Sequence, residues 1–132
     1  MNYRGVIIEE SLENKYILKD IKILGTEIEK VDAHHETPWL SQWTKHEVDI
    51  PEDEAASVAK KISHSLDSAH GGSWYADFKN DTHHYIIYRD KVFRVNRKSK
   101  EQYDEAERYG LSLGIPSDQL INYKGEYRDE PL

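Results

Sequence analysis

The chain has 132 residues, no cysteine and a formal net charge of −7 at pH 7. This length suits one domain that buries roughly two thirds of its unfolded surface. A chain without cysteine has no disulfide, no thiol nucleophile and no cysteine-based zinc site. The acidic balance predicts that nucleic acid is not a partner, since domains that grip phosphate backbones usually carry an excess of Lys and Arg.

The N-terminal segment MNYRGVIIEESL lacks a basic stretch followed by a long apolar run, which predicts that there is no secretory signal. No segment of the chain reaches the roughly 18 apolar residues that a membrane span needs. Glycine-rich phosphate-binding loops are also absent from the sequence. We therefore expect a soluble, cytoplasmic protein with no membrane partner and no cofactor.

The first part of the chain alternates short apolar segments with turns. Tyr3–Glu9 is predicted to be a buried strand, and Ser11–Asp20 a short helix. Ile21–Asp32 is typical of a long strand that bends at Gly25, because the apolar alternation changes phase there. A loop over residues 33–43 follows; it contains Pro38 and two of the three tryptophans.

The middle of the chain contains the clearest helix. A strand at Thr44–Ile50 precedes it. From Pro51 to about Ser68, apolar residues recur at helical spacing. The buried side of this amphipathic helix is predicted to consist of Ala55, Val58, Ala59, Ile62, Leu66 and Ala69.

Residues 74–97 are the densest aromatic and β-branched stretch. Polar clusters divide it into three strands, Trp74–Lys79, His83–Arg89 and Lys91–Asn96. A three-residue first loop and a two-residue second loop would keep one apolar row in phase across all three strands. That row is predicted to be buried, and it consists of Trp74, Ala76, Phe78, His84, Ile86, Tyr88, Phe93 and Val95.

Ser99 followed by Gln102 predicts a capped helix, and Gly114 with Pro116 predicts its end. The elements then begin with the order βαββαβ of a ferredoxin-like fold. The sequence predicts a single α+β domain over residues 1–116, with a ferredoxin-like (split βαβ) antiparallel sheet extended by a three-strand meander and helices mainly on one face. Residues 117–132 are expected to form a loosely packed C-terminal tail.

Five stretches carry a resemblance to a known family: YRGVIIEES (3–11), TPWLSQW (37–43), WYADFKND (74–81), HHYIIYRDKVFRV (83–95) and YGLSLGIP (109–116). They resemble a family of short, single-domain, uncharacterised proteins from bacterial, archaeal and viral genomes. The resemblance implies a compact, free-standing protein. It carries over no activity, ligand or catalytic residue.

Seven histidines raise the question of a metal site. His34 and His35 are consecutive, as are His83 and His84, so the side chains within each pair diverge. A site would have to be assembled from distant segments, with His46 as one example of a further ligand. We therefore predict no metal site.

The second face of the three-strand stretch mixes aromatic rings with charges and is the best candidate for function. Asp is unfavourable in the middle of a strand, yet Asp77 lies there. Rings can stack on planar ligands, while Arg neutralises a carboxylate or phosphate. We predict a non-catalytic binding domain for a small planar or anionic, nucleotide-like ligand or a protein partner. Its predicted ligand-binding residues are Tyr75, Asp77, His83, Tyr85, Arg89, Arg94, Trp39 and Trp43.

One alternative from a different class is a small hydrolytic enzyme that uses Asp77 and His83, with or without a metal. The same residues suit a cross-strand ion pair on a solvated face, and no nucleophile-elbow motif is present, so the balance favours a protein that is not an enzyme. The loop tryptophans suit either the rim of a binding site or a plug at the end of the sheet.

The oligomeric state has two interpretations. Tyr85, Ile87 and Val92 would leave an apolar patch exposed in a monomer, and such patches commonly mark interfaces. This pattern favours a homodimer. If the helix over Ser99–Leu113 covers the patch, the protein is instead a monomer.

Overall fold

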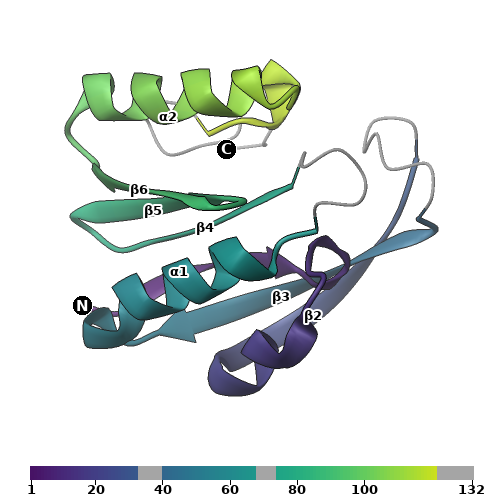
Figure 1. The fold of residues 1–132 in the computed structure, drawn as a ribbon. Coiled ribbons are helices and arrows are strands. Elements are labelled where there is room, and N and C mark those ends of the chain that lie inside the picture. The colour runs from purple at the N-terminus through teal and green to yellow at the C-terminus, as the bar shows by residue number, and fades with distance from the viewer. Residues whose placement is uncertain (33–39, 68–73, 122–132) are drawn as a thin grey trace.

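The computed structural model describes residues 1–32, 40–67 and 74–121. Within these ranges, six antiparallel strands form one sheet in the order β2-β3-β1-β4-β5-β6 (Figure 1). The protein is therefore α+β, as the sequence predicts. The strands are β1 (Tyr3–Ile8), β2 (Lys22–Lys30), β3 (Gln42–Ile50), β4 (Tyr75–Lys79), β5 (His83–Tyr88) and β6 (Lys91–Asn96).

The helices of the described ranges are two α-helices and several short 3-10 helices. Within the segment predicted as a short helix before β2, the structure has the 3-10 helix η2 (Lys15–Asp20), at whose start Asn14 Oδ1 accepts from Tyr16 N at 3.0 Å. None of the described helices is long and apolar enough to cross a membrane. The helices are α1 (Ala55–Ser65), α2 (Lys100–Ser112), η1 (Glu9–Ser11), η2 (Lys15–Asp20), η4 (Glu52–Glu54) and η5 (Ser117–Gln119).

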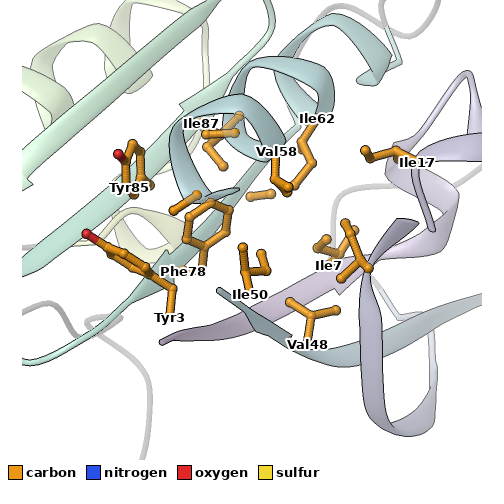
Figure 2. Close-up of a cluster of buried hydrophobic side chains, with 14 of the residues drawn as sticks. Tyr3, Ile7, Ile17, Val48, Ile50, Val58, Ile62, Phe78, Tyr85 and Ile87 are labelled. Carbon is orange, nitrogen blue, oxygen red and sulfur yellow. The ribbon is translucent and has the colours of Figure 1, made fainter. Parts of the chain in front are cut away.

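Helix α1 covers one face of the sheet, which we call the α1 face. The described part of the predicted apolar stripe is buried there: Ala55, Ala59, Ile62 and Leu66 have no exposed surface. Ala69, the last residue of the predicted stripe, lies outside the described residues. The helix itself begins four residues later than predicted, since the 3-10 turn η4 follows Pro51. Figure 2 shows the resulting core, to which the sheet contributes Tyr3, Ile7, Val48, Ile50, Phe78, Tyr85 and Ile87.

Helix α2 covers the opposite face, which we call the α2 face. Ser99 caps it as predicted, since its hydroxyl accepts from Gln102 N at 3.2 Å. Tyr103 and Ala106 are fully buried in a second cluster on this face, with Ile86, Tyr88 and Val95 of the sheet. Figure 1 shows β4, β5 and β6 between the two helices. The prediction that the helices lie mainly on one face is wrong.

The turn between β4 and β5 explains why the two helices cover opposite faces of the sheet. The sequence favours a loop of three residues, but the loop is Asp81–Thr82, closed by a bond from Asn80 N to His83 O of 3.0 Å. Asn80 Oδ1 also accepts from the backbone N–H groups of Thr82 and His83, at 3.0 and 2.9 Å. This side chain closes a turn that is one residue shorter than the apolar pattern indicates.

A difference of one residue moves every side chain of a strand to the other face relative to its neighbour. Phe78 therefore shares the α1 face with Tyr85 and Ile87, not with Ile86. Tyr85 and Ile87 are buried under α1, and Val92 is half-buried against the same cluster. The patch expected to hold a homodimer is thus covered within the chain, and by α1 rather than by the C-terminal helix.

The edge strand β2 contains the predicted bend. Ile23 pairs with Val48 of β3, whereas Gly25 pairs with Glu47, so Leu24 is the extra residue of a β-bulge. This confirms the phase change read from the sequence.

The chain continues into the α2 cluster after α2 ends. Leu120 and Ile121 are buried there. A Cβ atom on Gly110 would approach Leu120 Cδ2 to 2.6 Å and the Tyr88 hydroxyl to 2.7 Å, so glycine permits this close packing. The rest of the predicted tail, residues 122–132, lies outside the described residues.

Candidate binding site

Two tyrosines mark the end of the α1 face beside the start of α1. The rings of Tyr3 and Tyr85 lie edge to face with centroids 5.2 Å apart, and both pack against Phe78. The rings are buried, with 2% and 6% of the residues exposed. Figure 2 shows both hydroxyl groups at the same side of the cluster, away from Phe78.

Charged and polar groups surround these hydroxyls. Arg94 of β6 pairs with Tyr85 across the strands and is exposed. Half-buried His83 is two residues from Tyr85 on β5 and faces the same way. Glu52 of η4 lies close enough to influence both Tyr3 and His83 electrostatically, and its carboxylate accepts from the N-terminal amine at 3.2 Å.

The local electrostatics favour the neutral forms of the titrating groups. Burial, the largest effect, and Tyr85 raise the pKa of Tyr3, although Arg94 acts to lower it. Burial and the positive charge of Arg94 lower the pKa of His83, against a smaller raising effect of Glu52. Near neutral pH the cluster therefore offers the Arg94 guanidinium beside a neutral imidazole and the neutral phenol of Tyr3.

Arg94 and the tyrosine hydroxyls of this set are donors suited to an anion, whereas the nearby Glu52 carboxylate opposes one. Arg presents a planar fork of donors that matches a carboxylate or phosphate, and hydroxyl groups add further donors. Stacking on Tyr85 is not available to a ligand, because its ring is buried between Tyr3 and Phe78. The cluster of Tyr3, His83, Tyr85, Arg94 and Glu52 is called the two-tyrosine cluster below.

Three of the eight predicted binding residues thus come together: His83, Tyr85 and Arg94. Tyr75 and Asp77 lie on the other face of the sheet, where the Tyr75 hydroxyl donates to the carbonyl of Gln119. The sequence missed Tyr3 and Glu52 as members of the cluster. Tyr3 could have been found from its alternation with Ile7 on β1, whereas nothing in the sequence indicates that Glu52 is near.

The remaining predicted residues lie elsewhere. Arg89 is at the other end of α1, where its guanidinium donates to the carbonyls of Leu66 and His64 and to Glu13. Trp43, near the start of β3 and so away from Tyr3 and Tyr85, packs against Trp74 with ring centroids 5.5 Å apart. Trp39 lies outside the described residues.

Asp77 takes part in a buried chain of hydrogen bonds on the α2 face. His84 Nε2 lies 2.7 Å from Asp77 Oδ2, and His84 Nδ1 lies 3.0 Å from the Tyr103 hydroxyl. His84 and Tyr103 have no exposed surface, and Asp77 is 9% exposed. The chain links β4, β5 and α2. The structure pairs Asp77 with His84, and His83 points to the opposite face.

Among the described residues, no group of three or more His, Asp or Glu side chains is arranged to hold a metal ion. Comparisons of the chain with protein-family models, with curated proteins and with solved structures give no match.

Proposed function

We propose that the protein is a non-catalytic binding domain whose two-tyrosine cluster holds an anionic group of a small ligand. The observation that supports this most is the convergence of exposed Arg94 with His83 and the hydroxyls of Tyr3 and Tyr85 at one end of the α1 face. A nucleotide phosphate and a metabolite carboxylate share the chemistry that this cluster recognises. An acidic side chain of a protein partner is the other source of the same group.

Burial of the tyrosine rings narrows the ligand class expected from the sequence. A planar ligand would need an open ring face, and neither Tyr3 nor Tyr85 offers one. We therefore assign the binding energy to charge-assisted hydrogen bonds, which contribute roughly 1.5–3 kcal/mol each. Binding of this kind weakens as the salt concentration rises.

The test is calorimetry of the wild-type protein with three probes: inorganic phosphate, AMP and succinate. Arg94→Ala is expected to weaken the binding of the best probe roughly tenfold or more, since it removes the cation. Tyr85→Phe keeps the buried ring and removes only the hydroxyl, so a smaller loss, about fivefold, is expected.

Arg108→Ala is the matched control, because Arg108 is an exposed arginine on α2 and its loss changes the net charge equally. If Arg108→Ala weakens binding as much as Arg94→Ala, the effect is one of overall charge and the proposed site is wrong. If no probe binds but a protein partner is lost on Arg94→Ala, the source of the anionic group is a protein.

The alternative function, hydrolysis by a general base, has less support. Such a base must reach the substrate, whereas His84 is fully buried beside Asp77. We infer that the Asp77–His84–Tyr103 chain anchors α2 to the sheet.

For the fold, we propose that β2-β3-β1-β4 constitutes the split βαβ core, with η1 and η2 in the place of its first helix. The strand order and the antiparallel pairing of these four strands support this. A cytoplasmic location is part of the same proposal, since the sequence contains no cysteine.

A further inference from the structure

Strand β2 leaves one edge of the sheet without a partner strand in the described part of the chain. It is nine residues long and pairs only with β3. All of its residues are exposed except half-buried Glu29. Three large apolar side chains are among them, Ile23, Leu24 and Ile28, which are 39%, 40% and 62% exposed. An exposed edge of this length is a template for the addition of another strand.

The bulge at Leu24 decides which side chains of β2 share a face. Ile23 and Ile28 are five positions apart, so in a regular strand they would point to opposite faces. Because Leu24 is the extra residue, both instead point to the α1 face. Lys22 and Glu29 are seven positions apart and share the α2 face for the same reason.

We propose that two copies of the chain form a dimer by pairing their β2 strands antiparallel, with the twofold axis at Thr26. Ile23 of one copy then lies opposite Ile28 of the second copy on the α1 face. Lys22 lies opposite Glu29 of the second copy on the α2 face. A twofold axis repeats each pair, so the edge is complementary to itself in apolar contact and in charge.

Neighbouring registers lack this complementarity. An axis at Glu27 places the two Glu27 side chains opposite each other, and an axis at Ile28 opposes Glu27 to Glu29 twice. Like charges directly opposite each other are destabilising. An axis moved to Gly25 shortens the paired segment. The axis at Thr26 therefore gives the longest pairing without opposed like charges.

Light scattering coupled to gel filtration, over a wide range of protein concentration, tests the dimer. We expect the mass to rise with concentration from the 15.5 kDa chain mass to twice that value. Ile28→Lys places a charge in the apolar pair and should leave a monomer, with little effect on folding because Ile28 is exposed. Leu111→Lys is the matched control, since it also replaces an exposed aliphatic side chain by Lys, on α2, and it should dimerise normally.

A charge exchange tests the register. Lys22→Glu opposes Glu to Glu twice in the dimer, and Glu29→Lys opposes Lys to Lys twice, so each variant alone is expected to dimerise roughly tenfold more weakly. Mixed together, the two variants restore both pairs and should form a heterodimer. Within one chain, Glu29 also binds Lys45, with Nζ and Oε2 2.5 Å apart. Lys60→Glu on α1 is the net-charge control for Lys22→Glu, because it makes the same change at an exposed position.

Three results would overturn the proposal. The first is a monomer at every concentration, and the second is a dimer that survives Ile28→Lys unchanged. The third is a mixture of Lys22→Glu with Glu29→Lys that associates no better than either variant alone. None of these variants lies in the two-tyrosine cluster, so anion binding is expected to be unchanged in all of them.

Discussion

The two halves of the sheet are buried in different ways. In the half formed by β4, β5 and β6, α1 covers one face and α2 the other, and five consecutive residues of β5, 84–88, are buried. In the half formed by β1, β3 and β2, the described residues cover only the α1 face, and there they cover β1 and β3 but leave β2 exposed. Val6 of β1 is 42% exposed on the other face, and β2 is exposed almost throughout. A second covering helix is what turns an alternating strand into a continuously buried one.

The same division of the sheet separates the two proposed properties, anion binding and dimer formation. The two-tyrosine cluster combines β1, β5 and β6, so it depends on the junction between the halves at the β1–β4 pair. The dimer edge belongs to the half that is covered on one face only. Changes to the junction should therefore affect the whole fold, whereas changes at β2 should affect association alone.

The largest effect is expected at the junction itself. Gly5 pairs with Phe78, and a Cβ atom added there would approach Asp77 O to 2.0 Å and Phe78 Cα to 2.7 Å. Backbone cannot yield as a flexible side chain does, so Gly5→Ala should destabilise the protein by about 3 kcal/mol or more. Urea denaturation followed by circular dichroism measures the free energy of unfolding.

Gly25→Ala is the control for this comparison. Nothing lies within 4 Å of a Cβ atom built on Gly25, and this residue is on the exposed edge strand. Its substitution should change the free energy of unfolding by less than about 0.5 kcal/mol. Equal losses from Gly5→Ala and Gly25→Ala would contradict the view that the β1–β4 pair is the tight junction.

A smaller effect is expected where α2 covers the sheet. Tyr103→Phe removes the hydroxyl that lies 3.0 Å from His84 Nδ1 and keeps the ring, so a loss of about 1 kcal/mol is expected. Amide hydrogen exchange should become faster in α2 and remain unchanged in β2 and β3. Uniformly faster exchange would show that the two halves unfold as one unit and that the hydroxyl does not act through α2.

Local spacing in the sequence was sufficient for the parts of the fold that depend on one segment. The stripe of α1, the Ser99 cap of α2 and the bend at Gly25 are all visible in the residues themselves. The faces to which the β4 side chains point are not visible in this way. Asn80 closes the β4–β5 turn with side-chain hydrogen bonds, and the pairing of β4 with β5 is thereby shifted by one residue from the predicted register. Because both faces of β5 are apolar and buried, the apolar pattern is compatible with either register of β4.

The same one-residue difference in the β4–β5 turn explains which residues of the candidate site the sequence places wrongly. The predicted three-residue turn places Tyr75 and Asp77 on the face of Tyr85, whereas the shorter turn of the structure places them on the α2 face. His83, Tyr85 and Arg94 were grouped correctly because the β5–β6 turn has the two-residue length that the sequence predicts. Tyr3 comes from β1, in the other half of the sheet. Its alternation with Ile7 indicates a buried position, but no local pattern shows that its ring meets Tyr85.

The smallest expected effect concerns pH, and it sharpens the electrostatics of the two-tyrosine cluster. Burial and Arg94 lower the pKa of His83 below its ordinary value of 6.5, although Glu52 opposes them. The folded protein therefore binds fewer protons at this residue than the unfolded chain does. The resulting stability is complete above pH 6.5 and is lost as the pH falls through the lower pKa of the folded state.

This contribution can be isolated by measuring the free energy of unfolding against pH for the wild type and for His83→Asn. The advantage of the wild type should shrink as the pH falls below about 6.5, because only the wild type then takes up the proton on unfolding. Burial acts to raise the pKa of Glu10, but hydrogen bonds from Thr44 hold it below 4.5, so Glu10 acts in a more acidic range. Two curves that stay parallel from about pH 8 to pH 5 would show that His83 is not held neutral by Arg94 and its surroundings.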